Sequence, residues 1–360
     1  GPLASQILGD FGADVIKIES PRGDNVRHYP PFIESESVIY LLLNRNKRSF
    51  AIDLKTGEGL KLFYELVKTS DVVLEGFRPG TTKPLKIDFD TLKKLKHDII
   101  YCSLIGYDLE DMRSGHDLNY VGSTGILNIT GPKETPTPIG VPIADIGGGS
   151  LPTVISILAA LLNSKEEAQF LCVKMTEQLI PWLSVAAATY LAGLGEPQRE
   201  EHVLSGYNPF YRLYPTKDDR YVSFAPIEAK FWNNFCNAIG RKDLIGKQFD
   251  FNTCDIELPK IFVQKTQLEW KNWFSNNDVP GAPVLTVGEA LSVKSRLQQI
   301  YHSLAGKVSL FASPFLNYDN EVEIRPPPLL GQHTKEILNE LGFSNEFARL
   351  KQRGIIFTPE

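Results

Sequence analysis

Apolar and polar positions alternate with two different periods along the first third of the chain. The pattern predicts a series of elements in the order helix 3–11, strand 13–19, strand 49–54, helix 56–69, strand 71–75, helix 90–95 and strand 99–104. Strands that alternate with helices in this way favour a parallel, doubly wound sheet of the α/β class. Binding sites in such sheets lie beyond the carboxyl ends of the strands, which is where Arg78, Gly106-Tyr107 and His116 fall.

The pattern changes after residue 150. Apolar stretches predict helices at 151–162 and 175–194, and two alternating segments at 211–216 and 220–225 predict a β-hairpin. A last helix is expected at 331–341, packed back on the first domain.

From these elements we expect three parts. They are a large Rossmann-like domain at 1–195, a small α+β domain at 205–305 and a C-terminal segment at 320–360 that returns to the large domain.

Composition and charge exclude several classes of protein. A chain of 360 residues with 42% hydrophobic residues can bury the cores of two domains. The net charge of -5 gives no reason to expect nucleic-acid binding. The apolar run 151–162 is shorter than the roughly 20 residues of a membrane helix, so no membrane span is expected. The four cysteines are scattered, which favours reduced thiols over a zinc site or a disulfide framework.

Candidate proton-transfer chemistry lies in two glycine-bearing segments. His116 stands between Gly115 and Asp117, and Asp145 precedes the glycines at 147–149. Two groups that can exchange a proton are what a reaction at an acidic carbon requires. The glycine amides offer a place for a developing oxyanion. Each residue also has a structural interpretation, as a surface or capping histidine and as a helix-capping aspartate.

Other candidates are weaker when taken alone. Glu228 lies where a strand turns into a helix, a place where a glutamate is more often structural. A phosphate-bearing ligand would need several cations near strand ends, and the candidates are Arg22, Arg27, Arg45, Lys47, Arg48, Lys55 and Arg78. Neither a GxGxxG nor a Walker motif is present, so a nicotinamide or nucleoside-triphosphate site is unsupported.

Nearly the whole chain resembles the family III CoA-transferases, and within them the alpha-methylacyl-CoA racemases. The resemblance is carried by Gly1-Pro2, 8–19, Asn44-Arg45, Lys47-Arg48-Ser49, 53–55, 75–80, Gly115-His116-Asp117, 144–150 and 331–334. It implies a dimer of two interlocked chains, with each site between the large domain of one chain and the small domain of the other. Family members begin with a strand before the Gly-Pro, so we expect that an N-terminal strand is missing here.

The family contains two chemistries, and particular residues decide between them. Transferases of the family use an aspartate nucleophile at the position of Glu177, whereas racemases carry the equivalents of His116, Asp145 and Glu228. The resemblance therefore implies a racemase of 2-methylacyl-CoA thioesters. A CoA-transferase acting through Glu177 is the alternative, and a non-catalytic CoA-binding scaffold protein is a third.

The racemase resemblance implies a 1,1-proton transfer through an enolate. His116, supported by Glu228 from a second chain, would serve one face of the α-carbon and Asp145 the other. Residues Arg22, Arg45, Lys47, Arg48 and Arg78 would hold the CoA part of the substrate. No separate cofactor and no metal is implied.

Some segments depart from the family pattern. The loops 108–113 and 165–169 differ from it, and Met112 and Met175 are the chain's two methionines where some racemases use a methionine-rich surface. These departures leave the acyl chain open. No targeting signal is visible, so we expect a cytoplasmic protein in a bacterium and a mitochondrial or peroxisomal one in a eukaryote.

Overall fold

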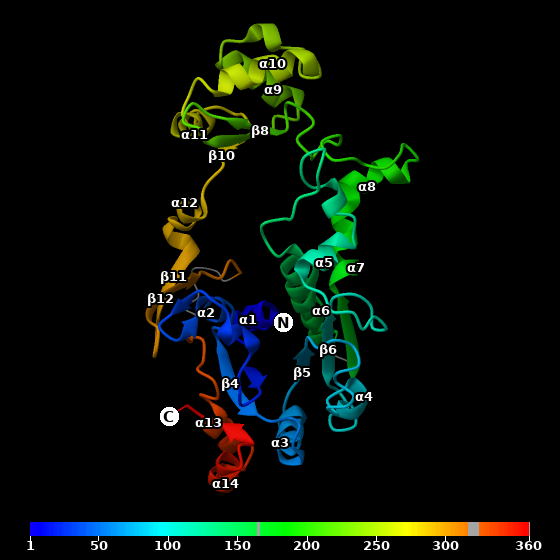
Figure 1. The fold of residues 1–360 in the computed structure, drawn as a ribbon, viewed down its shortest axis with the longest axis vertical. Coiled ribbons are helices and arrows are strands. Elements are labelled where there is room, and N and C mark those ends of the chain that lie inside the picture. Colours follow the sequence, from blue (N-terminus) through cyan, green and yellow to red (C-terminus); the bar gives the residue numbers. More distant parts are fainter. Residues whose placement is uncertain (164–165, 316–323, 360) are drawn as a thin grey trace. The chain divides into compact units, whose positions relative to one another are not determined.

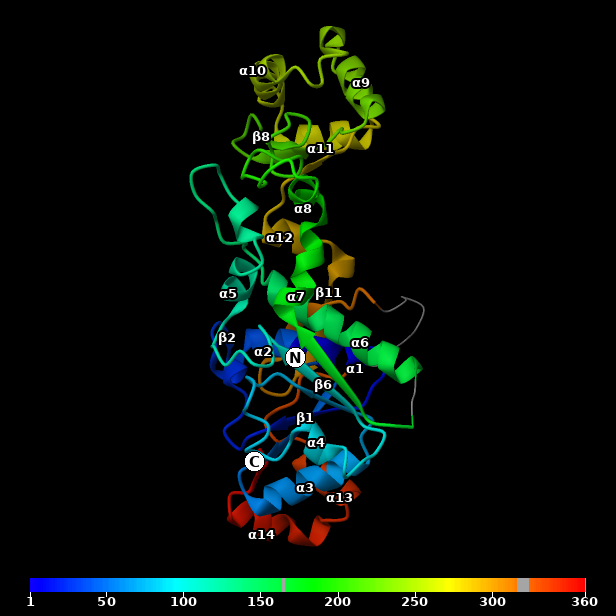
Figure 2. The same cartoon turned by 90° about the vertical axis from the view of Figure 1, so that its right-hand side faces the viewer.

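The computed structural model describes residues 1–163, 166–315 and 324–359, which form two compact units (Figures 1 and 2). Unit 1 consists of Gly1–Tyr120, Pro142–Leu179 and Val293–Glu360, and unit 2 consists of Val121–Val141 and Ile180–Ser292. The units are groups of residues in mutual contact. The domain bounds expected from the sequence, 1–195, 205–305 and 320–360, stay a prediction.

Unit 1 contains most of the strands. Its strands are β1 (Val15–Glu19), β2 (Phe32–Ile33), β3 (Glu36–Ser37), β4 (Lys47–Ile52), β5 (Val72–Glu75), β6 (Ile100–Ile105), β7 (Gln169–Lys174), β11 (Leu297–His302), β12 (Gly306–Phe311) and β13 (Ile356–Phe357). Its helices are α1 (Pro2–Asp10), α2 (Val38–Leu43), α3 (Gly57–Lys68), α4 (Phe89–Leu92), a π-helix (Ala144–Ser150), α6 (Leu151–Leu162), α7 (Met175–Leu179), α13 (Thr334–Glu340) and α14 (Phe347–Gln352). Helix α5 (Asp117–Gly122) runs from unit 1 into unit 2.

Six strands of unit 1 form two three-stranded sheets, while β11 pairs with β12 and β2 with β3 in two-stranded ones. In one, β5, β6 and β7 are all parallel, with β6 in the centre and buried along its whole length. In the other, β1 and β4 are parallel and β13 pairs antiparallel with β4. The α/β class is confirmed. The described strands lie in separate sheets, one of them mixed, so the single doubly wound parallel sheet is not seen. Strand β7 was not predicted.

The C-terminal segment returns to the core of unit 1. Figure 1 shows α13 and α14, in red, beside β4 and α3, in blue. Their apolar side chains share one buried cluster, which includes Phe50 of β4, Leu62 of α3, Ile337 of α13, Leu350 of α14 and Ile356 of β13. Each of these side chains is nearly inaccessible to solvent, so the return of the C-terminal segment closes the core.

Two residues of the segment 331–334 complete the hydrogen bonding of β4. The His333 Nδ1 atom accepts a 3.1 Å bond from the Ser49 N–H, and the His333 N–H donates to the Ser49 carbonyl oxygen at 3.1 Å. The Thr334 hydroxyl oxygen accepts from the Ala51 N–H at 3.1 Å. This family motif therefore has a structural role, since buried strand amides must find partners.

We expect the His333 contact to make stability depend on pH. Burial lowers the pKa of His333, so the folded protein binds this proton less tightly than the unfolded chain does. Stability from this residue is therefore lost as pH falls below about 6.5, the usual histidine value. His333→Asn keeps an acceptor near the Nδ1 position and removes the titration.

The test is the melting temperature between pH 5 and pH 7.5. The melting temperature of the wild type should fall more steeply toward acid than that of His333→Asn. A matched change at exposed His97 should keep the wild-type slope. If the melting temperatures of the wild type and His333→Asn change equally with pH, His333 is not the source of the pH dependence.

One predicted helix is broken, and another is confirmed with an additional helical segment before it. The predicted helix 175–194 is broken into α7, a 3₁₀ turn (Ile180–Leu183) and α8 (Ser184–Leu191), because Pro181 cannot continue an α-helix. The predicted helix 151–162 is confirmed as α6. The π-helix continues it back to Ala144, and this 19-residue helix is apolar enough to cross a membrane by length and composition alone. Its side chains Val154, Ile157 and Ala160 are buried in unit 1, so packing accounts for the apolar character of this face, while Ile155 and Leu162 are 66% and 88% exposed.

Unit 2 combines a small sheet with helices. Its strands are β8 (Arg212–Pro215), β9 (Tyr221–Phe224) and β10 (Gly281–Pro283), and its helices are α8, α9 (Ala229–Ala238), α10 (Phe251–Phe262), α11 (Gln267–Ser275) and α12 (Val287–Leu291). The predicted β-hairpin is confirmed by the antiparallel pairing of β8 with β9. The core is aromatic, with ring centroids 4.5 Å apart for both Phe224–Phe235 and Tyr214–Phe262.

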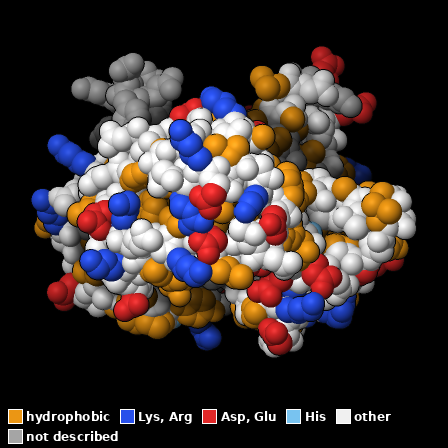
Figure 3. Space-filling view, turned by 90° about the horizontal axis from the view of Figure 1, so that it is seen from above, with side chains coloured by type: hydrophobic (Ala, Val, Ile, Leu, Met, Phe, Trp, Pro, Cys, Tyr) orange, Lys and Arg blue, Asp and Glu red, His pale blue; other side chains and the backbone are white. Residues whose placement is uncertain are grey.

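Charged side chains of both signs are mixed on the face that Figure 3 displays. Lysines and arginines lie beside aspartates and glutamates, with apolar side chains between them. A mixed surface of this kind does not concentrate potential of one sign.

Candidate active site

The candidate residues of unit 1 follow the ends of three parallel strands. Strand β5 ends at Glu75, β6 at Ile105 and β7 at Lys174. Because the strands are parallel and adjacent, their carboxyl ends lie at one edge of the sheet. Arg78, His116 and Glu177 lie in the segments that leave this edge, so the topology places the candidates of both chemistries beyond the same strand ends.

His116 lies just before α5 on a well-supported backbone. Its N–H donates to the Asn119 Oδ1 atom at 3.0 Å, and its carbonyl oxygen accepts from the Asn119 N–H at 2.8 Å. The Tyr120 hydroxyl donates to the Gly115 carbonyl oxygen at 2.7 Å. A Cβ atom at Gly115 would lie 2.6 Å from the Tyr120 ring, so this position requires glycine. The histidine is exposed, and its backbone is held from both sides.

Asp145 lies at the start of the π-helix, directly beside the His116 segment. A single carboxylate oxygen of Asp117 accepts from the Ala144 N–H at 2.7 Å and from the Asp145 N–H at 3.0 Å. Asp145 is exposed at the surface of this chain, yet partial desolvation of its carboxyl raises its pKa and the negative charge of Asp117 raises it further. Asp117, the neighbour of His116 in the sequence, therefore connects the His116 segment to the backbone of Asp145.

The glycine run after Asp145 has a packing role. Gly147 to Gly149 are buried inside the helical segment. A Cβ atom at Gly148 would lie 2.7 Å from the Met175 carbonyl oxygen, so the glycine allows α7 to pack closely against the π-helix. The predicted enolate stabilisation by these amides is not supported, because they lie within a buried helix. The same packing brings α7, with exposed Glu177, against the helix that carries Asp145.

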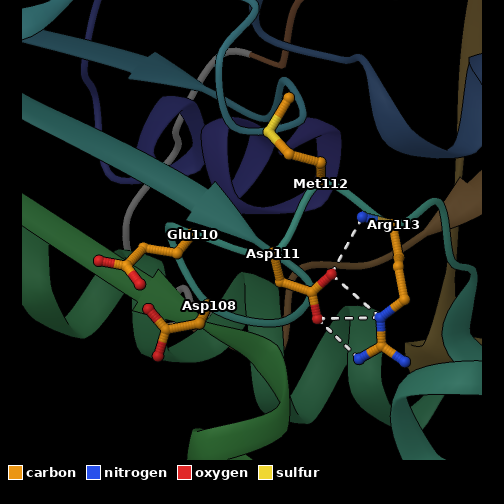
Figure 4. A pocket seen from close by; sticks show the side chains of 5 residues that line it. All are labelled: Asp108, Glu110, Asp111, Met112 and Arg113. Atoms are coloured by element: carbon orange, nitrogen blue, oxygen red, sulfur yellow. Dashed lines mark hydrogen bonds and ion pairs between the residues drawn. The ribbon is translucent and has the colours of Figure 1, made fainter.

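The loop 108–113 surrounds an open hollow of about 720 Å³, shown in Figure 4. The lining residues are Asp108, Glu110, Asp111, Met112 and Arg113. The Arg113 guanidinium donates to both carboxylate oxygens of Asp111, at 2.6 to 3.1 Å. The loop is therefore stabilised by its own charged residues, and Asp108 ties it to β7 through a 2.7 Å ion pair with Lys174.

The same loop contacts the aromatic residues behind His116. The Arg113 guanidinium lies 4.6 Å from the centre of the Tyr107 ring, a cation–π contact. The Tyr107 ring lies edge-on to Tyr120, with 5.0 Å between centroids. The loop that departs from the family pattern thus supports the His116 backbone through the contacts of Arg113 with Tyr107 and of Tyr107 with Tyr120.

A second cavity, of about 370 Å³, lies under the loop that follows β5. Its lining includes the cations Arg78 and Lys83, the carboxylates Glu75, Asp88 and Asp90, and the aromatic residues Phe77, Phe89, Tyr101 and Phe170. Burial raises the pKa of Glu75 at its base. Aromatic faces beside cations can hold a flat ring and a phosphate. Lys83 was missed from the sequence because no local motif distinguishes it from a surface lysine.

Three of the predicted CoA-binding cations are engaged inside unit 1. Arg45 forms a buried ion pair with Asp10 at 2.5 Å, and its side chain is 3% exposed. The Lys47 ammonium donates to three oxygens, those of Pro2, Leu43 and Asn44. Arg45 and Lys47 therefore do not fit the role of phosphate ligands that was expected of them. A buried cation with satisfied hydrogen bonds is not available to a phosphate.

Arg48 is the third of these cations. It pairs with Asp14, Glu336 and Glu340, which fastens α13 to the first sheet. The geometry gives Arg48 a structural role as well. By contrast, Arg22 and Arg78 are exposed and form no ion pair with any residue in the described ranges, so these two remain candidates for the phosphates.

Glu228 belongs to unit 2, at the N-cap of α9. Its side chain does not cap the helix, and it makes no hydrogen bond with the residues that the structure describes. The carboxylate is exposed and free to meet another group. Its expected contact with His116 of another chain stays a prediction.

Three of the four cysteines, Cys102, Cys236 and Cys254, are buried and offer no nucleophile. Burial raises the pKa of Cys102 and Cys236 to about 12 and that of Cys254 to about 11, which keeps them in the thiol form. Within residues 1–163, 166–315 and 324–359, no three His, Cys, Asp or Glu residues gather in a way that could hold a metal ion.

Comparisons with known proteins identify the family. Residues 1–334 match the model of CoA-transferase family III. Succinyl-CoA:glutarate CoA-transferase of Mus musculus is 31% identical over 365 residues, 95% of this chain and 83% of that protein. Alpha-methylacyl-CoA racemase of Homo sapiens is 30% identical over 362 residues, 96% of this chain and 91% of that protein.

A solved structure agrees with the sequence matches. The crystal structure of a CAIB/BAIF family protein from Brucella suis superimposes with a TM-score of 0.80 at 26% identity, covering 94% of this chain and 95% of that one. The resemblance stated from the sequence is confirmed: this chain belongs to CoA-transferase family III.

Proposed function

We propose that this protein is a racemase that interconverts the two epimers of 2-methylacyl-CoA thioesters. The observation that carries the proposal is that Asp117, the neighbour of His116, accepts hydrogen bonds from the backbone amides of Ala144 and Asp145. Racemisation by two bases needs two proton carriers held at a fixed separation. The similarity to alpha-methylacyl-CoA racemases supports the same conclusion.

The chemistry follows from what the two side chains can do. One of them removes the proton from the α-carbon of the substrate. The electron pair of the broken C–H bond moves into the thioester group to form an enolate. The other then gives a proton to the opposite face of the same carbon. Both must be able to carry a proton, and the raised pKa of Asp145 brings its acid form closer to neutral pH. Imidazole exchanges protons in the same range in proteins generally.

We place the CoA part of the substrate beside the strand that precedes Arg78. The aromatic walls of the cavity there suit the adenine, and Arg78 and Lys83 would hold the phosphates on the side away from Glu75, Asp88 and Asp90. CoA belongs to the substrate, so the proposal requires no further cofactor.

Activity would require a dimer in this proposal. Glu228 of the partner subunit would orient His116, as the family resemblance implies. Helix α8 supports an interface, because Tyr190 and Leu191 are 61% and 80% exposed on it and Trp182 just before it is 55% exposed.

A CoA-transferase is the second candidate, favoured by two observations. Several similar proteins are transferases, among them the succinyl-CoA:glutarate enzyme. Glu177 also lies exposed on α7, which packs against the helix of Asp145. Its carboxylate would attack the thioester carbonyl, forming an acyl anhydride and releasing CoA as a thiolate.

The deciding experiment is incubation of (R)-2-methylacyl-CoA with the protein in heavy water. A racemase should incorporate deuterium at the α-carbon and form both epimers. Glu177→Gln should retain this activity, because Glu177 takes no part in the proton transfer. Hydroxylamine trapping of an acyl group at Glu177, without deuterium incorporation at the α-carbon, would favour the transferase. A wild type that neither exchanges nor transfers would favour the non-catalytic scaffold.

A further inference from the structure

Asp117 is the one member of the Gly115-His116-Asp117 segment to which sequence reasoning gave no role. It follows His116 directly and begins α5. Its side chain, however, does not stay within its own segment. The Oδ1 atom reaches the start of the π-helix and accepts from two consecutive amides, those of Ala144 and Asp145. No other side chain in the described part of the chain accepts a hydrogen bond from either amide.

We propose that Asp117 is a positioning residue that sets the separation between His116 and Asp145. The inference rests on the proposed function, because it assigns those two residues as the opposed proton carriers. One end of the connection is covalent, through the peptide bond between His116 and Asp117. The other end is a pair of charge-assisted hydrogen bonds, which the Asp117 carboxylate accepts from the amides of Ala144 and Asp145. Such bonds are stronger than neutral ones.

The geometry makes this connection short and stiff. The His116 backbone is already held by Asn119, and Tyr120 holds the preceding residue. On the other side, close packing of Gly148 on Met175 restrains the π-helix. Asp117 joins these two restrained segments, so its loss would release one proton carrier relative to the other. Catalytic groups tolerate little displacement, and about 1 Å can cost about a hundredfold in rate.

Asp117 also acts on Asp145 through its charge. Its carboxylate is one cause of the raised pKa of Asp145, after burial. The effect of the Asp117 charge and the effect of its hydrogen bonds can be separated by mutation. Both amides donate to the same oxygen atom, so a neutral side chain with one oxygen can keep the bonds. Asparagine can present its amide oxygen in that place and lacks the charge. Alanine removes both the charge and the acceptor.

The experiment compares Asp117→Asn and Asp117→Ala with the wild type in heavy water. For Asp117→Ala, we expect inversion of the α-carbon to fall about a hundredfold with little change in KM. The epimer whose α-proton faces His116 should still exchange with retention, because that base stays in place. For Asp117→Asn, we expect inversion near the wild-type rate and an acid limb of the kcat profile shifted to lower pH.

A matched control separates positioning from a general loss of helix capping. Asp250 caps α10 in unit 2 by accepting from the Thr253 N–H at 3.2 Å. Asp250→Ala should lower stability as a lost cap does and leave inversion unchanged. Equal inversion rates for Asp117→Ala and wild type would overturn the proposal. So would an Asp117→Asn variant that loses as much inversion as Asp117→Ala.

Amide hydrogen exchange at Ala144 and Asp145 provides a readout that does not depend on activity. Asp117→Ala should lose protection at these two amides, and Asp117→Asn should keep most of it. If the wild type shows no α-proton exchange, the proposed function fails while this measurement still tests the connection. Unchanged protection in Asp117→Ala would overturn the connection itself.

Discussion

Replacement of Asp145 by asparagine is expected to reduce racemisation by about 10²- to 10⁴-fold, the range typical of a lost general acid or base. Asparagine has nearly the same shape but cannot take up or release the proton. The Asp117 carboxylate accepts its hydrogen bonds from the backbone amides of Ala144 and Asp145. The Asp145 side chain takes no part in them, so the local structure should persist. The loss should therefore appear in kcat, with the binding of the acyl-CoA retained.

The direction of proton exchange makes this prediction specific. In heavy water, Asp145→Asn should still exchange the α-proton of one epimer, through His116, and return it to the same face. His116→Gln should show the opposite preference, through Asp145. Mass spectrometry of each epimer after incubation measures both. If Asp145→Asn inverts substrate at the wild-type rate, or if the two variants exchange the same epimer, the two-base proposal is wrong.

Removal of the Asp10 carboxylate is expected to lower the free energy of unfolding by about 3–5 kcal/mol. Asp10 and Arg45 form an ion pair in which both side chains are at most 3% exposed. Without Asp10, the Arg45 guanidinium would remain buried with a single bond to the Phe311 carbonyl oxygen. A buried charge that loses its partner cannot recover its hydration, and this is the source of the large effect.

Denaturant unfolding of three variants measures this effect. Asp10→Ala should be strongly destabilised, and the double change Asp10→Leu with Arg45→Met should recover part of the loss, because it leaves no charge behind. Lys68→Met, which breaks an exposed pair with Glu65 on α3, should leave stability nearly unchanged. An Asp10→Ala variant as stable as the wild type would show that Arg45 is free for a ligand after all.

Local pattern was enough to predict many elements of the fold. Strands β1, β4, β5 and β6 and the hairpin of β8 and β9 lie where periodicity and turn residues predicted them. These signals depend on neighbours a few residues apart, which a sequence displays directly. Strand pairing depends on residues far apart, and the described strands of the predicted single sheet lie in separate sheets. The pairing of β13 with β4 joins Ile356 to Ile52 and could not be seen from either segment alone.

The candidate site divides in the same way. The sequence by itself determined which proton-carrying groups exist, their glycine-bearing surroundings and, through the motifs, membership of the family. The tertiary structure decided which polar groups are free. It pairs Arg45 with Asp10 and Arg48 with Asp14, Glu336 and Glu340, while leaving Arg78 exposed.

The role of Asp117 shows why this division exists. In the sequence it is one more carboxylate beside a histidine, and its chemistry there is unspecified. In the fold its oxygen meets two amides that are 27 and 28 residues away along the chain. Availability and position come from contacts between distant residues, because burial and hydrogen bonding are properties of the packed chain. Residue type alone determines what a group can do, and packing determines whether and where it can do it.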